Sequence, residues 1–277
     1  MSQINKLSNF QQRVLIGLPG AFLIIWGICV SQWFYFGIFF LICSLSIIEF
    51  YNLLRQNQYH PQPIIGTFTG VFLFILTFLV ETQILDSSLY FLMFPLVALI
   101  FFIVLYKIKE NNRPFINIGL TLLGIIYVAL PIALINFCVI NDGEYYYEVV
   151  LGILLLLWAS DTGAYFSGKS IGKHKLFERI SPKKTWEGTI GGALLSLAFA
   201  IGMAQFFDVL SLWKWITLSL IIVIAGTYGD LIESLFKRSF EIKDSGKLLL
   251  GHGGFLDRFD GLFFAAPFIV AFLRIFL

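Results

Sequence analysis

Nine long apolar runs constrain what this chain can fold into. Most are about 17–22 residues long, close to the roughly 20 residues that a helix needs to span a bilayer. In lipid every backbone N–H and C=O group must be satisfied within its own segment, so runs of this length are expected to be helical. A composition that is 58% hydrophobic and 13% charged agrees with this. The predicted spans lie near 14–30, 33–52, 64–80, 89–106, 117–139, 148–166, 188–207, 212–230 and 261–277.

The predicted fold class is therefore all-α, a polytopic membrane helical bundle with about nine transmembrane helices. We expect one integral membrane domain over 1–277, because no linker or internal repeat separates a second one. The N-terminal spans in 1–147 carry little chemistry, whereas 148–277 holds two charge-rich loops and the spans between them.

The distribution of basic residues predicts the orientation. If the N-terminus is cytoplasmic, all of the 19 Lys and Arg residues fall on the cytoplasmic side except Lys214 and Arg274. Cytoplasmic loops of membrane proteins carry such an excess of Lys and Arg. Both charge-rich loops, 167–187 and 231–260, are then cytoplasmic, in a protein that we expect in the cell (inner) membrane.

Carboxylates at the ends of apolar runs are the first candidates for a site. Asp161 follows the run 149–160 and Asp230 follows 215–229. Ionisable groups at such positions are costly unless they are paired, bind metal or line a wet cavity. Glu233 and Lys237 follow Asp230 at helical spacing, so they share its helix face. Two carboxylates three residues apart repel unless a cation lies between them; the alternative is neutralisation by Lys237 and Arg238 on a solvated helix.

Asp257 and Asp260 precede the last span, where we predict a helix that begins near Gly261. Their simplest role is to cap that helix. Sites made of carboxylate oxygens also suit hard cations, and Mg²⁺ is usually held by one or two carboxylates together with substrate phosphates. The pattern predicts that Asp230 and Asp257, from two different helices, together supply the protein ligands of a Mg²⁺ site. The three cysteines lie inside spans without His or Cys at ligand spacing, which argues against zinc and against disulfides.

The segment from Ser181 to Gly188 supplies positive charge. Ser181 suits a helix N-cap and Pro182 the first helical position, so we predict a helix that begins there. Lys183 and Lys184 then occupy a first turn, where the helix dipole disfavours cations. A bound phosphate would account for this placement. The alternative is an orientation signal that contacts lipid headgroups.

The glycine-rich segment Gly251–Gly254 permits close approach of backbone N–H groups to a phosphate. His252 lies within it, between Lys243-Asp244 and Asp257-Arg258, and is a candidate for phosphate contact. The basic loops are short and interrupted by acids, so nothing indicates nucleic-acid binding. The residues alone predict metal-assisted phosphoryl or nucleotidyl transfer at a membrane surface, which needs positioning and cations more than a protein nucleophile.

These motifs resemble those of phosphatidate cytidylyltransferases, also called CDP-diacylglycerol synthases. The resemblance is carried over 158–261 by three segments, and Leu250 departs from it where the family usually has Pro, Gly or Ser. The matching residues are Asp161, Ala164 and Tyr165; Ser181–Gly188; and Ser234, Lys237, Arg238, Lys243, Asp244, Gly246, His252, Gly253, Gly254, Phe255, Asp257, Arg258, Phe259 and Asp260.

The resemblance implies the reaction CTP + phosphatidate giving CDP-diacylglycerol and pyrophosphate, with Mg²⁺ and a second cation left open. It implies Asp230 and Asp257 as metal ligands and a catalytic set completed by Asp260, Lys237 and His252. It further implies substrate contacts from Lys183, Lys184, Arg238, Lys243, Asp244, Asp161, Glu233, Gly253, Gly254 and Arg258. Membrane lipids are expected neighbours, and the family implies a homodimer, which Gly188 and Gly192, four apart in a span, would also suit.

Two alternatives stay open. The closest is a CTP-dependent transferase or kinase that acts on an isoprenoid lipid, because the apolar spans do not reveal lipid preference. The other is a transporter, in which Asp161 and Asp230 would line a pathway. Transporters place such residues near the bilayer midplane. Here the acids cluster at one edge, which favours the enzyme.

Overall fold

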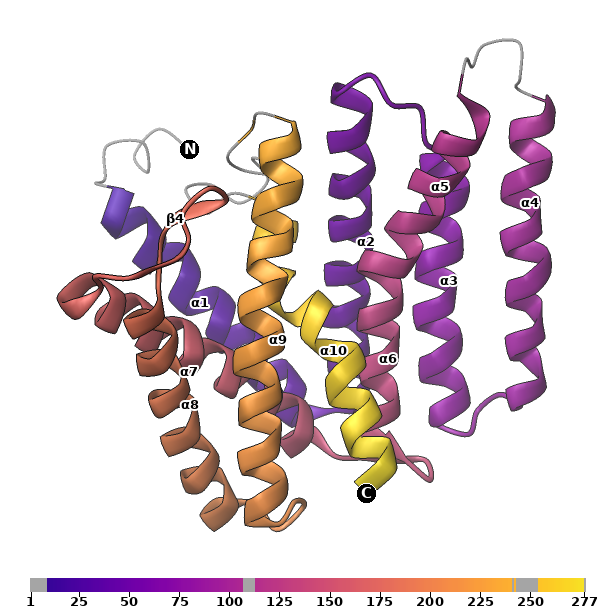
Figure 1. Ribbon diagram of the computed structural model, residues 1–277. Helices are drawn as coiled ribbons and strands as arrows, with labels where there is room; N and C mark the ends of the chain where they lie inside the picture. Colours follow the sequence, from indigo (N-terminus) through magenta and orange to yellow (C-terminus); the bar gives the residue numbers. More distant parts are fainter. Residues whose placement is uncertain (1–8, 107–112, 241, 243–253, 277) are drawn as a thin grey trace. The chain divides into compact units, whose positions relative to one another are not determined.

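In the part of the chain that it describes, the computed structural model consists of helices and two short β-hairpins (Figure 1). It describes residues 9–106, 113–240, 242 and 254–276, with the backbone alone at 9–18. The elements are α1 Asn9–Val30, α2 Gln32–Gln56, α3 Pro63–Glu81, η2 Ser87–Leu92, α4 Met93–Tyr106, α5 Pro114–Gly124, η4 Ile125–Ala129, α6 Leu130–Val139, β1 Ile140–Asn141, β2 Glu144–Tyr145, α7 Tyr147–Ile171, β3 Lys175–Phe177, β4 Ser181–Thr185, α8 Trp186–Phe206, α9 Leu212–Ser239 and α10 Leu256–Phe276.

The predicted spans are largely confirmed. Among the described residues, eight helical segments are long and apolar enough to cross a membrane, and the apolar part of α1, Pro19–Val30, is shorter. The protein is therefore an all-α, multi-pass membrane protein. The span predicted at 117–139 is built from α5, the π-helical η4 and α6 in succession.

Two predicted helix starts are wrong. The helix expected at Ser181 begins at Trp186, and Ser181–Thr185 form strand β4 instead. The last helix begins at Leu256 rather than near Gly261, so Asp257 lies in its first turn and Asp260 in its second. The helix-dipole argument for Lys183 and Lys184 therefore does not apply, because both lysines belong to a strand.

The described chain forms two compact units. The first comprises the described residues of 1–80, 84–130 and 244–258, and the second those of 81–83, 131–243 and 259–277. The single domain predicted for 1–277 stays a prediction. The division after residue 130 differs from the one we drew at 147, because the span 131–139 belongs to the second unit.

Tyr51 of α2 organises the packing of the first unit. Its ring is buried between Gly66 of α3 and Gly124 of α5, and a Cβ atom at Gly124 would lie 2.6 Å from ring atoms. The Tyr51 hydroxyl donates a hydrogen bond to the carbonyl oxygen of Thr121 at 2.6 Å. The Thr121 hydroxyl in turn accepts the backbone N–H of Gln62, which holds the connection between α2 and α3.

Close helix contacts through small residues organise the second unit. A Cβ atom at Gly192 of α8 would lie 2.6 Å from the carbonyl oxygen of Ser160 in α7, and one at Gly188 would lie 3.0 Å from that of Ala164. Both glycines thus pack within the chain, so their spacing is no evidence for a dimer. On the same helix, Ser196 accepts a hydrogen bond from Ser219 of α9 at 2.9 Å.

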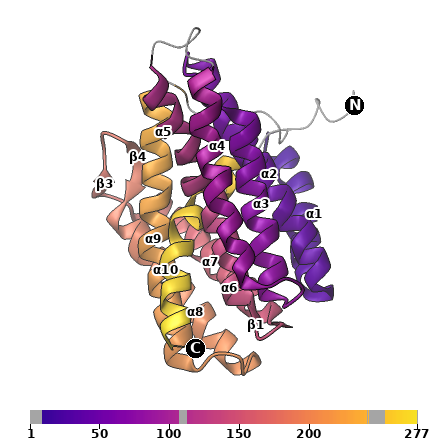
Figure 2. The same cartoon turned by 90° about the vertical axis from the view of Figure 1, so that its right-hand side faces the viewer.

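The β3–β4 hairpin lies beside α9 in both views of the molecule (Figures 1 and 2). Its strands are antiparallel, with Lys175 opposite Thr185 and Phe177 opposite Ser181. The hairpin places Lys184 of β4 against α9, which positions one basic group of the candidate site.

Candidate active site

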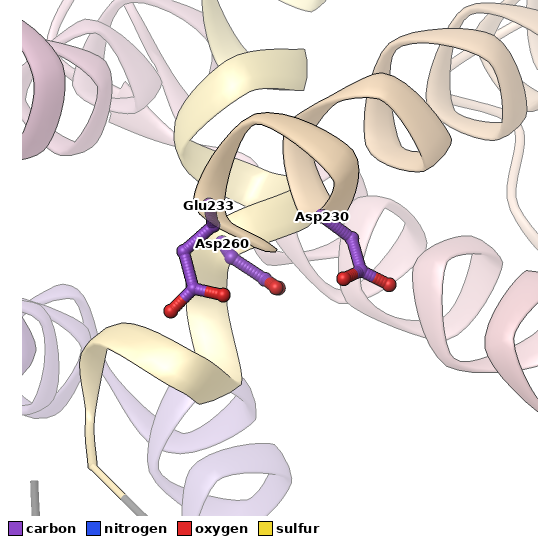
Figure 3. A group of neighbouring side chains, drawn as sticks. All are labelled: Asp230, Glu233 and Asp260. Carbon is purple, nitrogen blue, oxygen red and sulfur yellow. The ribbon is translucent and has the colours of Figure 1, made fainter. Parts of the chain in front are cut away.

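Three carboxylates meet in the second unit: Asp230 and Glu233 of α9 and Asp260 of α10 (Figure 3). One oxygen from each lies within 4.8 Å of the others. The i, i+3 spacing puts the first two on one helix face. Gly229 admits α10 beside that face, since a Cβ atom there would lie 2.8 Å from the carbonyl oxygen of Asp260.

Two lysines offset this negative charge. Lys184 of β4 lies 2.5 Å from an oxygen of Asp230 and also donates to the carbonyl oxygen of Thr227 at 3.3 Å. Lys237 lies 2.5 Å from an oxygen of Glu233, whose side chain is fully buried. Three carboxylates and two ammonium groups leave one formal negative charge. An all-oxygen donor set of this kind suits a hard divalent cation such as Mg²⁺.

The β3–β4 hairpin is fastened to the start of α8. The Thr185 hydroxyl accepts the N–H of Gly188 at 3.2 Å, which makes Thr185 the N-cap that we had placed at Ser181. Glu187 accepts the backbone N–H groups of Lys173 and His174 and lies 2.5 Å from Nδ1 of His174. Lys183 is exposed, whereas Lys184 is turned toward α9.

The start of α10 is organised in the first unit. The carboxylate of Asp257 accepts the N–H of Gly254 at 2.9 Å, and that of Glu49 accepts the N–H of Phe255 at 2.7 Å. Gly254 is buried against Glu49, which fills the space of any side chain at position 254. The bond of Asp257 thus goes to the segment before α10 and not to an N–H group of the helix. The predicted capping role of Asp257 and its predicted pairing with Asp230 as a metal ligand both stay predictions.

The other predicted residues are placed as follows. Asp161 lies inside α7, which continues to Ile171. Arg238 is exposed in the last turn of α9, and Arg258 is exposed in the first turn of α10. Lys243, Asp244, His252 and Gly253 lie outside the described residues.

Sequence reasoning missed Glu49, Thr185 and Glu187. Glu49 is only 4% exposed, in the last third of the apolar helix α2. A buried ionisable group in a predicted membrane span is costly and marks a candidate for function. That signal was present in the sequence, but we gave the first spans no weight. Thr185 and Glu187 carried a weaker signal, since a cap followed by an acid two residues later is common at helix starts.

Comparison with known proteins shows the family to which the chain belongs. The model of the cytidylyltransferase family matches residues 11–276. A phosphatidate cytidylyltransferase of Staphylococcus haemolyticus (strain JCSC1435) is 37% identical over 227 residues, which are 81% of this chain and 85% of that protein. One of Staphylococcus aureus (strain COL) is 40% identical over 176 residues, 63% of this chain and 66% of that protein. This chain belongs to the cytidylyltransferase family.

Proposed function

We propose that the protein transfers the cytidylyl group of CTP to phosphatidate and releases pyrophosphate. The observation that carries this proposal is the cluster of Asp230, Glu233 and Asp260 with its two lysines, in a chain of this family. The names of its relatives supply the two substrates. The product is CDP-diacylglycerol, which makes the protein an enzyme of phospholipid biosynthesis.

The three clustered carboxylates would hold a divalent cation, Mg²⁺ in our proposal. The donor set fits this ion because it consists of oxygen atoms alone and keeps a net negative charge beside the lysines. When bound, the ion would offset phosphate charge and orient the nucleotide. Asp257 remains a proposed further ligand on the strength of the family resemblance.

The reaction needs no nucleophile from the protein, because the substrate brings its own phosphate oxygen. That oxygen forms a bond to the α-phosphorus of CTP while the bond to the β-phosphate bridge breaks. The electron pair of the broken bond leaves with pyrophosphate. Ammonium and guanidinium groups would bind the phosphates and offset their charge, which is how much of the barrier to such transfers is lowered. These groups are Lys183, Lys184, Lys237, Arg238 and Lys243, with His252 orienting a phosphate.

We place the site at the cytoplasmic face of the cell membrane and propose that the protein acts as a homodimer. The cytoplasmic placement rests on the concentration of Lys and Arg in the loops that flank the site. CTP is then available from the same side. The lipid substrate is available from the surrounding leaflet.

The test is turnover by the purified, detergent-solubilised protein with CTP labelled separately in the cytidine and the γ-phosphate. We expect a lipid product that carries the cytidine label with phosphatidate, and no product once a chelator removes divalent ions. Isoprenoid phosphates and alcohols serve as competing substrates. A lipid product that carries the γ-phosphate without cytidine would contradict the proposal and favour a lipid kinase.

A further inference from the structure

An open groove of about 710 Å³ runs between α2 and α3 in the first unit. Each helix contributes a regular stripe to its walls: Phe40, Ser44 and Ile48 on α2, and Phe68 and Phe72 on α3. Both stripes repeat every four residues, which keeps them on one helix face. Phe68 is 55% exposed, so the groove opens away from the packed core of the unit.

One end of the groove is charged. Arg55, in the last turn of α2, lines this end together with Pro63 and Ile64. Among the described residues, no acidic side chain forms an ion pair with Arg55. Helix α3 begins at Pro63, so the positive end of its dipole lies at the same place. This end of the groove therefore favours an anion.

The length of the groove matches one leaflet of a bilayer. Its lining on α3 runs from Pro63 to Ile75, about 18 Å at a rise of 1.5 Å per residue. The hydrocarbon core of a bilayer is about 30 Å thick, so one leaflet contributes about 15 Å. An acyl chain of a lipid whose headgroup lies at Arg55 would reach about as far as Ile75, the last residue of α3 that lines the groove.

We propose that this groove binds an anionic glycerophospholipid of the surrounding membrane. One acyl chain lies between the two apolar stripes, and the headgroup phosphate pairs with Arg55. Charge-assisted bonds between guanidinium and phosphate are among the stronger ones in proteins. An apolar helix from a second copy of the chain would also cover the stripes, but it would leave the guanidinium without an anion.

The groove shares no residue with the cluster of three carboxylates. The residues that line the groove belong to the first unit, whereas Asp230, Glu233 and Asp260 belong to the second. The proposal therefore does not depend on the cytidylyltransferase reaction. Its test measures lipid binding and needs no turnover.

The test is titration of the detergent-solubilised protein with lipid, followed by native mass spectrometry. Phosphatidylglycerol and phosphatidylcholine with identical acyl chains separate the effect of headgroup charge from that of the chains. We expect the unsubstituted protein to bind phosphatidylglycerol about fivefold more tightly, the effect of one basic residue at a membrane surface. Arg55→Gln should abolish this preference, and Arg113→Gln, at the start of α5 outside the groove, should keep it.

A second pair of variants tests the apolar walls. Thr67→Trp and Ile48→Trp each place bulk in the groove and should weaken binding of both lipids several-fold. Phe102→Trp, on an exposed part of α4, is the matched control and should leave binding unchanged. Equal binding of the two lipids by the unsubstituted protein would overturn the headgroup assignment. A dimer that Thr67→Trp converts to a monomer, without any change in lipid binding, would assign the groove to a second copy and overturn the proposal.

Discussion

At the scale of single residues, the candidate site depends on where α10 begins. A start at Leu256 rather than Gly261 puts Asp260 on a formed helical turn, one turn after Asp257. Gly229 then lets that turn approach α9, so that Asp260 joins Asp230 and Glu233. The sequence indicated each of these acids as a candidate. Their grouping depends on the close contact of Gly229 with α10, which no sequence pattern predicts.

Asp230→Asn and Glu233→Gln should each lower turnover about 100-fold or more. Each change removes one charge from the proposed cation site while keeping the shape of the side chain. Loss of residues that only support metal ligands already costs about 10- to 100-fold, so loss of a ligand should cost at least as much. Turnover as a function of Mg²⁺ concentration is the measurement. Asp208→Asn, in an exposed loop, is the control, and full activity of either site variant would remove that residue from the site.

Glu49→Leu should destabilise the protein by about 1–3 kcal/mol, because it leaves the N–H of Phe255 without its acceptor. Glu49→Gln keeps an acceptor oxygen and should retain most of the stability. Thermal unfolding in detergent measures the difference between the two variants. Equal stability of the leucine and glutamine variants would show that the hydrogen bond to Phe255 contributes nothing.

At the scale of elements, the sequence predicted helices well and their ends poorly. Length and hydropathy specify a membrane helix because lipid leaves the backbone no alternative. The ends lie in water, where Ser181 and Pro182 suit a helix start and an edge strand equally. In the structure Ser181–Thr185 form strand β4. The Thr185 hydroxyl caps α8, and Glu187 binds the backbone N–H of Lys173 just before strand β3.

Packing within the first unit gives a prediction at this scale. Gly124→Ala should destabilise the protein by about 1–3 kcal/mol, because its methyl group would overlap the ring of Tyr51. Gly119→Ala, on the same helix, has open space around the added carbon and should cause no loss. Thermal unfolding of both variants in the same detergent is the measurement. A Gly124→Ala protein as stable as Gly119→Ala would contradict the packing described here.

At the scale of the whole molecule, segments far apart in the sequence meet within each unit. Phe255 is 206 residues from Glu49, and Arg274 pairs with Glu81 across 193 residues at 2.5 Å. Neither contact can be predicted from the helical periodicity of the sequence, because that periodicity indicates only which residues share a face of one helix. Charge distribution, in contrast, predicts orientation for the whole chain, since it sums over all loops.

Orientation in the membrane can be tested with single cysteines in a cysteine-free background. Glu178→Cys, in the β3–β4 hairpin, should react with a membrane-impermeant maleimide only after the cells are opened. Asp208→Cys, between α8 and α9, should react in intact cells. The reagent's mass added to each variant is the measurement. The reverse pattern would contradict a cytoplasmic site.

The bond between Glu49 and Phe255 bears on how the protein is made. During translation α2 leaves the ribosome long before the segment that contains Phe255 exists. Until the last helix is made, the carboxylate of Glu49 lacks the backbone N–H group that it accepts in the folded protein. A chain that ends before Phe255 would lack this partner permanently, so we expect its first unit to be less stable than that of the full chain.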